Sequence, residues 1–282
     1  MTLNKSMLAI AMCPVFFFLA CKTSTSAEAT TSSSETPASS GTYRTFETSF
    51  EQVSDFNGFY IVPQGDYDST HELATDIVKD GTKSHKAWIL KARDINNDGI
   101  IYLPHRAYPT IQFHKTTAGS FRTPCLVSFW VYLDMNLVDK PTGSIDDWFS
   151  FATLSPDSSD NWARTVLVNI APDGYVRLVH VPRQGEQTYL YQTGSLKFPY
   201  KQWVRLDILI DFSAANGYAK VWQDSQLVSY ARVEGGAGML AQAHFGLYAS
   251  AAIPSGTVYN DKLRIKEVKD EAEALVLVAG SW

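Results

Sequence analysis

Residues 125–134 read CLVSFWVYLD, and apolar side chains occupy every second position of this stretch. The odd positions carry Cys125, Val127, Phe129, Val131 and Leu133, and the even positions include Ser128, Trp130, Tyr132 and Asp134. Successive side chains of a β-strand point to opposite faces of the sheet, so this period of two predicts a strand with one buried face.

The same pattern recurs along the chain between hairpin turns. Residues 203–212 (WVRLDILIDF) alternate in the same way. Further predicted strands cover 164–170, 175–181, 188–192 and 218–223, and the turns between strands include Pro172-Asp173-Gly174, Arg183-Gln184-Gly185-Glu186, Asn216-Gly217 and Asp224-Ser225. The best helical segment is around His71–Lys79. Ten or more antiparallel strands predict an all-β fold, a two-sheet sandwich.

The C-terminal half resembles the jelly rolls of the concanavalin A-like lectin/glucanase superfamily. The matching segments are Gln202–Leu206, Asn216–Asp224, His244–Tyr248 and Gly256–Ile265. Laminin-G-like modules, glycan-binding modules and several polysaccharide lyases share this order of strands. The resemblance implies an antiparallel jelly-roll sandwich over residues 43–268, but it does not separate lectins from enzymes.

The N-terminus is typical of an exported bacterial lipoprotein. Lys5 precedes an apolar run over residues 7–20, which is shorter than the roughly 20 residues of a membrane span and fits a signal peptide. The run ends in Phe18-Leu19-Ala20-Cys21, which resembles a lipobox with Phe18 in place of the usual Leu. We therefore expect residues 1–20 to be removed and Cys21 to be lipidated. By the sorting rule for Gram-negative lipoproteins, Lys22 favours the outer membrane.

A Ser/Thr-rich segment, residues 21–42, follows the lipobox and has no aromatic side chain to bury. We expect a disordered tether there. Residues 269–282 lie outside the resemblance, and we expect either a C-terminal tail or, from their apolar run, an extra strand. Within the predicted domain Cys125 is alone, so we expect a buried thiol and no internal disulfide.

Composition restricts the partners of this domain. The formal net charge of −5 gives no drive toward phosphate backbones, which disfavours nucleic acid as a partner. Aromatic residues make up 13% of the chain, and aromatic rings suit the apolar C–H faces of sugars. The expected partners are thus a polysaccharide or glycan and, through the N-terminal lipid, a membrane.

Residues 105–115 (HRAYPTIQFHK) carry the most suggestive candidate residues. As one strand, this segment would present Arg106, Tyr108, Thr110, Gln112 and His114 on one face. That face is either an ordinary solvated surface or a row of hydrogen-bonding groups that bind a glycan. Trp130 and Tyr132 share the polar face of their own strand, where they could stack on sugars or lie under a loop.

Two enzymatic hypotheses use carbohydrate chemistry. In jelly-roll lyases, Arg, Gln or Asn neutralises a uronate while His or Tyr acts as base and Tyr as acid. The residues of these types are Arg106, Gln112, His114, His180, Tyr189 and Tyr191. His180 alternates with Val176 and Leu178, so it could equally be a core residue. The E-x-D-x-E string of sandwich glucanases does not occur, which disfavours a glucanase of that type.

Residues 94–99 (DINNDG) resemble the first half of a calcium loop, with oxygen ligands at Asp94, Asn96 and Asp98. An Asx-rich turn explains the same residues, because position 12 is His105 and not Glu. No other cofactor is indicated. The leading hypothesis is non-catalytic polysaccharide binding by an envelope-anchored lipoprotein. The alternatives are a polysaccharide lyase and a structural or adhesive lipoprotein with a protein partner.

Overall fold

The computed structural model describes residues 42–93, 103–140, 147–190 and 196–281. The structure does not describe Cys21, the tether up to residue 41, the calcium-loop candidates Asp94, Asn96 and Asp98, or Tyr191. Within the described part, no helix is long and apolar enough to cross a membrane.

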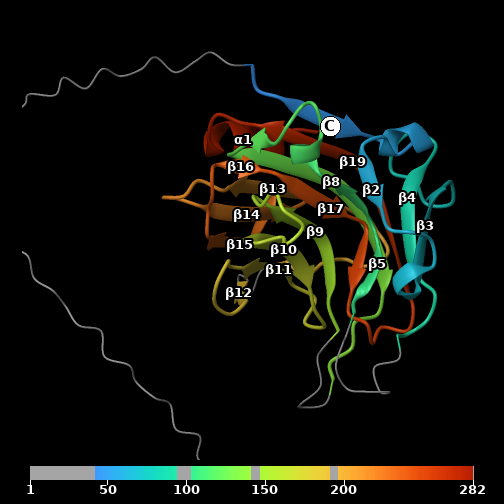
Figure 1. Ribbon diagram of the computed structural model, residues 1–282. Helices are drawn as coiled ribbons and strands as arrows, with labels where there is room; N and C mark the ends of the chain where they lie inside the picture. Colours follow the sequence, from blue (N-terminus) through green and yellow to red (C-terminus); the bar gives the residue numbers. More distant parts are fainter. Residues whose placement is uncertain (1–41, 94–102, 141–146, 191–195, 282) are drawn as a thin grey trace, which may run out of the picture. The chain divides into compact units, whose positions relative to one another are not determined.

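Two antiparallel sheets form the domain (Figure 1). Sheet A has, in spatial order, β15 (Gln226–Arg232), β14 (Tyr218–Gln223), β13 (Trp203–Asp211), β8 (Cys125–Met135), β19 (Gly256–Glu267), β4 (Ser84–Ile89) and β3 (Ser69–Ala74), with β1 (Thr45–Thr48) paired to β19. Sheet B has β12 (Thr188–Leu190), β11 (Val176–Val181), β10 (Thr165–Ile170), β9 (Phe149–Ser155), β17 (Gln242–Phe245), β6 (Pro109–Ile111) and β2 (Phe59–Ile61); β18 (Leu247–Ala249) pairs with β9 and with β5 (His105–Ala107).

Short elements complete the described chain. They are the β7 (Phe121–Arg122) and β16 (Met239–Leu240) pair, three 3-10 turns η1 (Val53–Phe56), η2 (Asp66–Asp68) and η3 (Phe113–Lys115), and α1 (Glu271–Ala279). The predicted all-β jelly-roll sandwich is therefore the fold of this domain.

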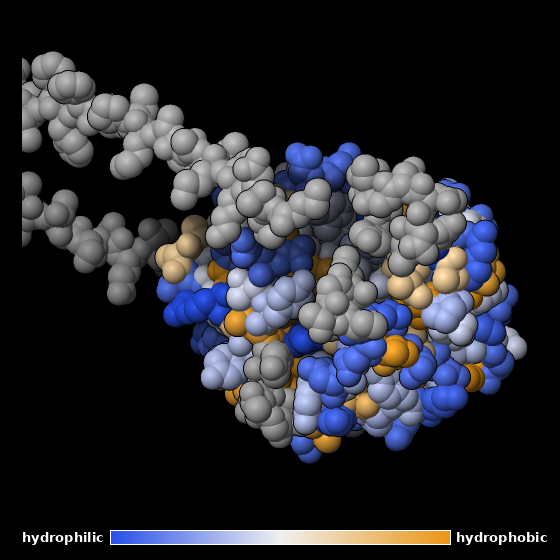
Figure 2. Space-filling view, turned by 90° about the horizontal axis from the view of Figure 1, so that it is seen from below, coloured by the Kyte–Doolittle hydropathy of each residue, from blue (hydrophilic) through white to orange (hydrophobic). Residues whose placement is uncertain are grey.

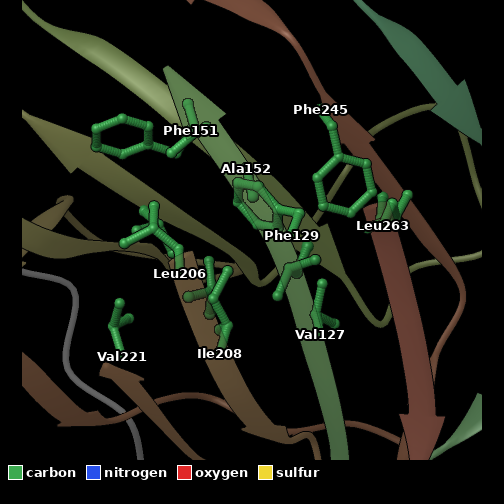
Figure 3. Close-up of a cluster of buried hydrophobic side chains, with 14 of the residues drawn as sticks. Val127, Phe129, Phe151, Ala152, Leu206, Ile208, Val221, Phe245 and Leu263 are labelled. Carbon is green, nitrogen blue, oxygen red and sulfur yellow. The ribbon is translucent and has the colours of Figure 1, made fainter. Parts of the chain in front are cut away.

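The core lies between the two sheets and is built from the apolar positions of the alternating strands. Figure 3 shows Val127 and Phe129 of β8 beside Leu206 and Ile208 of β13, with Phe245 of β17 facing them from sheet B. All five side chains are at most 2% exposed. Cys125 is also fully buried, and burial raises the pKa of its thiol well above the ordinary value, which makes it an inert core residue.

Most predicted strands are confirmed, and three predictions need correction. Residues 69–74 form β3, not the helix expected around His71–Lys79, because this segment pairs with β4 along its whole length. The tail forms helix α1 instead of an extra strand, and Ala274 and Val278 pack on Leu126 and Trp222 on the outer face of sheet A.

The single strand expected over residues 105–115 is divided into β5, β6 and the turn η3. Pro109 opens β6, and a proline has no N–H for a continuous ladder. The predicted alternation holds for Ala107 and Ile111, which enter the core, and for Arg106 and Tyr108, which line the opposite face of sheet B.

Candidate functional site

A groove of about 1250 Å³ lies on the face of sheet B that turns away from the core. Its lining includes Arg106 and Tyr108 from the β5–β6 segment, Thr153 from β9, and His244 and Tyr248 from β17 and β18. Further lining residues are Trp148, Trp162, Leu167, Asn169, Arg177, Val179, Tyr189, Lys140, Asp147 and Asp160. The groove thus combines aromatic rings with charged and amide groups.

Strand pairing places one row of residues in register across seven strands on this face of sheet B; its members from Tyr189 to His244 line the groove, and Thr110 and Tyr60 continue the row beyond the lining residues. The row is Tyr189, Val179, Leu167, Thr153, His244, Thr110 and Tyr60. At about 4.8 Å for each step between strands, the row extends over roughly 29 Å. Its two end members are exposed tyrosines, Tyr60 at 57% and Tyr189 at 59%. An extended chain molecule could contact the whole row.

His244 is the centre of an aromatic cluster in this row. Its ring stacks on Tyr108 with centroids 4.0 Å apart, and Trp162 and Tyr248 lie at 5.2 Å and 5.3 Å. Neither ring nitrogen has a hydrogen-bond partner among the described residues. Burial, and after it the nearby charge of Arg106, lowers the pKa of His244 to about 3. The imidazole is therefore neutral at physiological pH, with both nitrogens unused by the fold.

Arg106 supplies positive charge beside this cluster. Its guanidinium lies 5.0 Å from the ring of Tyr67 and 5.7 Å from the ring of Tyr248. Among the described residues no carboxylate forms an ion pair with Arg106, and its buried Nε has no hydrogen-bond partner. Burial raises the pKa of Tyr108 to about 12 and also raises that of Tyr248, although Arg106 opposes both shifts. Both phenols are thus protonated, beside a cation that has no carboxylate partner among the described residues.

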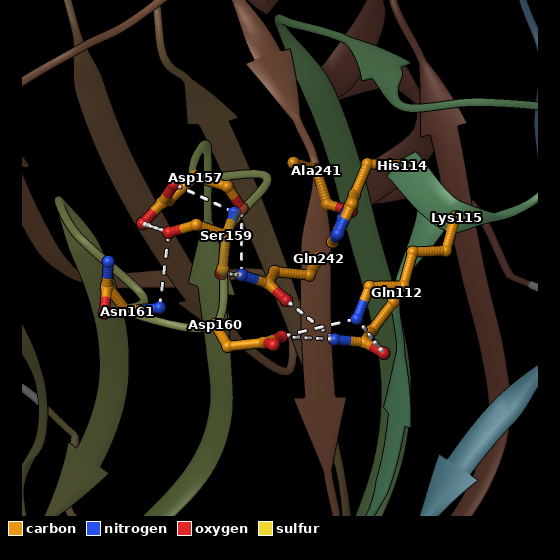
Figure 4. A network of polar contacts seen from close by, with 9 residues as sticks. All are labelled: Gln112, His114, Lys115, Asp157, Ser159, Asp160, Asn161, Ala241 and Gln242. Carbon is orange, nitrogen blue, oxygen red and sulfur yellow. Dashed lines mark hydrogen bonds and ion pairs between the residues drawn. The ribbon is translucent and has the colours of Figure 1, made fainter.

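A polar network fixes the loop that carries Trp162 over the groove (Figure 4). The buried Gln242 donates from Nε2 to the carbonyl oxygens of Asp157 and Ser159, each at 2.8 Å. Gln112 donates to Asp160 at 3.3 Å, and Lys115 forms an ion pair with the same carboxylate at 3.3 Å. Trp162 itself has a left-handed φ of 51°, a costly conformation for a bulky residue.

The structure brings together three of the residues predicted from the sequence: Arg106, Tyr108 and Tyr189 all line the groove. Gln112 and His114 are not among the lining residues. Gln112 belongs to the loop network, and His114 Nδ1 lies 3.1 Å from the carbonyl oxygen of Ala241.

The other predicted residues lie elsewhere. His180 is held between the Thr165 carbonyl at 3.3 Å and the Glu234 N–H, which donates to Nε2 at 3.0 Å, so both its nitrogens serve the fold. Trp130 and Tyr132 belong to β8 of sheet A, where Lys79 covers Trp130 at 3.9 Å and Tyr132 meets the edge of Trp203 at 5.9 Å. They are not part of the groove.

Sequence reasoning missed His244, Tyr248, Trp162 and Arg177 as site residues. The sequence did contain a signal for His244 and Tyr248, the alternation of the apolar positions beside them. Phe245 and Leu247 are apolar strand positions that enter the core, so their neighbours His244 and Tyr248 must face the other side. Trp162 had no such signal because it lies in a loop.

Hydrophilic residues cover most of the coloured surface that Figure 2 shows, with apolar residues scattered among them. Among the described residues, no three His, Cys, Asp or Glu side chains gather as metal ligands.

No family model matches the sequence, and no curated protein matches it either. The structure is similar to the endo-β-1,4-glucuronan lyase of the fungus Trichoderma reesei, with a TM-score of 0.54 and 13% identity over 79% of this chain and 95% of that one. It is also similar to Cellulose induced protein, Cip1, with a TM-score of 0.51 and 13% identity over 78% of this chain and 96% of that one. At these identities the likeness shows the fold alone, and that fold is a two-sheet antiparallel jelly-roll sandwich.

Proposed function

We propose that the groove of sheet B binds an acidic polysaccharide. The observation that carries this proposal is Arg106: a guanidinium on the wall of a large groove, without a carboxylate partner among the described residues and flanked by Tyr67 and Tyr248. A sugar carboxylate would supply the missing anion through charge-assisted hydrogen bonds. The aromatic rings and the exposed tyrosines at both ends of the row suit the C–H faces of sugars.

Direct binding measurements on the full chain test this proposal. Titration calorimetry with a polyuronate and with a neutral glucan should show preference for the polyuronate. Arg106→Gln should weaken that binding by tenfold or more, since hydrogen bonds to charged groups contribute about 1.5–3 kcal/mol. Arg232→Gln, on the edge strand β15 away from the groove, serves as the matched control. The proposal fails if the wild type prefers the neutral glucan or if both variants behave alike.

A second candidate function, polysaccharide lyase activity, is favoured by the convergence of Arg106, Tyr108, His244 and Tyr248. In β-elimination a base removes the proton from C5 of a uronate, the electron pair forms a C4=C5 double bond, the C4–O bond breaks, and the leaving oxygen takes a proton. Arg106 would neutralise the carboxylate, neutral His244 would accept the proton, and a protonated tyrosine, Tyr108 or Tyr248, would donate one. The pKa shifts account only for the resting protonation states, a neutral His244 and protonated tyrosines, and each shift weakens its group as a base or an acid.

The ultraviolet absorbance of the unsaturated uronide separates the two candidates. Rising absorbance with polyuronate that His244→Gln abolishes while binding persists would establish a lyase. Binding without any rise in absorbance across a panel of polyuronates would leave a binding module.

We also propose envelope anchoring through a lipid on Cys21, which the Lys5 to Cys21 signal supports. Cys21→Ala should move the expressed chain from the membrane fraction to the soluble fraction and abolish its labelling by a fatty acid. Unchanged membrane association of this variant would contradict lipid anchoring.

A further inference from the structure

A second arginine lies on the same register line of sheet B as Arg106. Arg177 of β11 pairs with Asn169 of β10, and Asn169 pairs with Ser150 of β9. The next pair along β9 and β18 is Phe149 with Ala249, which places Ser150 opposite Tyr248. Tyr248 in turn pairs with Arg106 of β5. The two arginines are therefore four strand steps apart, roughly 19 Å at the usual strand spacing.

Both arginines line the groove, and neither is fully neutralised by the residues described. Arg106 has no salt bridge to a described residue. Arg177 has one, to Asp173 at 3.8 Å, but that carboxylate is 40% exposed. Long, exposed ion pairs of this kind contribute little. Arg177 also lies 5.9 Å from the ring of Tyr189, so an aromatic ring accompanies this charge as well.

The acidic residues of the groove do not cancel these two charges. Asp147 pairs with Lys140 at 3.2 Å, and Asp160 pairs with Lys115 at 3.3 Å. Each carboxylate thus already has its own lysine. Asn169 and Tyr248, which lie on the line between the arginines, carry no formal charge. The positive charge that the described groove offers a ligand is therefore concentrated at its two arginines.

We infer that the groove has two subsites for sugar carboxylates, one at Arg106 and one at Arg177. Together they favour a polysaccharide with several acidic sugars over one with a single acidic sugar. This inference rests on the proposed binding of an acidic polysaccharide and specifies how the carboxylates are spaced along that polysaccharide. One strand step is about 4.8 Å, which is close to the length of one pyranose unit in an extended chain, so about four sugar units separate the two subsites. The ligand class is a linear polyuronate that carries its charge at regular intervals, and short or singly charged oligosaccharides can occupy only one subsite.

A series of oligouronates of increasing length, titrated into the full chain, tests the two-subsite arrangement. Arg106→Gln should weaken binding at every length. Arg177→Gln should leave dimer and trimer binding unchanged and weaken hexamer binding by about tenfold, a loss of about 1.4 kcal/mol. Arg232→Gln should behave as wild type at every length.

The possible outcomes separate this inference from the function on which it rests. If Arg106→Gln weakens binding and Arg177→Gln has no effect at any length, or the same effect at all lengths, the second subsite is wrong and the proposed function stands. If the wild type binds no oligouronate or polyuronate, both fail.

Discussion

The imidazole of His244 lies face to face with the phenol ring of Tyr108, with 4.0 Å between the ring centroids and 22° between the planes. β17 and the β5–β6 segment, which are far apart in the sequence, bring these two rings together in the groove. The stack leaves both ring nitrogens of His244 without a partner among the described residues, and its pKa is lowered to about 3.

Stability should therefore decrease in acid, in part through His244. The unfolded chain binds a proton at the ordinary pKa of 6.5, whereas the folded chain resists protonation down to about 3. The stability that the neutral His244 contributes is fully present above pH 6.5. Between pH 6.5 and about pH 3 it decreases by about 1.4 kcal/mol for each pH unit. His244→Phe keeps an aromatic ring and removes the titration. Urea unfolding at pH 7.5 and pH 5 should show a pH-dependent loss that is smaller by about 2 kcal/mol in this variant.

His85, whose burial also lowers its pKa to about 3, remains in the His244→Phe variant. The variant should consequently keep part of the acid sensitivity. Equal pH dependence in wild type and variant would show that the folded state accommodates a charged His244.

The period of two predicted the strands of this fold well, because one face of nearly every strand is buried against the other sheet. β8 and β14 were expected almost to the residue. The helix α1 was missed although its start was encoded: Asp270 accepts from the Glu273 N–H at 3.0 Å, and Glu273 accepts from the Lys269 N–H. The apolar run that follows fits a strand as well as a helix, and only packing on sheet A decides between them.

The groove was predictable only in part, because alternation indicates which face a residue occupies but not which strands are neighbours. Arg106 and Tyr108 were found as polar positions of one segment. Their pairing with Tyr248 and His244 follows from strand order, which the period of two does not contain. Trp130 was predicted to stack on sugars because of its aromatic ring. It belongs to sheet A and not to the groove, and alternation could not show which sheet its strand joins.

Gly246 should tolerate no side chain. Its φ is 100°, and an added Cβ would lie 3.0 Å from Cε1 of His85 and 3.1 Å from the carbonyl oxygen of Ala107. Gly58 serves as the control: its φ of 84° is similar, and nothing lies within 4 Å of an added Cβ. Gly58→Ala therefore measures the cost of the positive φ alone. Gly246→Ala should cost about 1–3 kcal/mol more than Gly58→Ala in urea unfolding. Equal costs would mean that the neighbours of Gly246 move aside freely.

Arg205 should hold α1 on sheet A. Its guanidinium donates to the carbonyl oxygens of Gly280, at 2.6 Å, and Val278, and its Nε donates to the buried Asp207 at 2.8 Å. A lysine cannot make all of these hydrogen bonds at once, because its single ammonium group cannot reach the acceptors that the planar guanidinium group contacts. Arg205→Lys should lower the free energy of unfolding by about 1–3 kcal/mol and speed hydrogen exchange in residues 271–279. Lys220→Gln, which removes a more exposed ion pair to Glu271, should cost less than 1 kcal/mol.

The two tyrosines at the ends of the groove row should each contribute to polysaccharide binding. Tyr60 and Tyr189 are exposed at opposite edges of sheet B, and Tyr230 is equally exposed, at 61%, on the edge strand β15 of sheet A. An aromatic contact contributes about 0.5–1.5 kcal/mol, so Tyr60→Ala and Tyr189→Ala should each weaken polyuronate binding by about two- to tenfold. Tyr230→Ala should leave the affinity unchanged. A loss at Tyr230 equal to that at the other two would place the polysaccharide on a different surface.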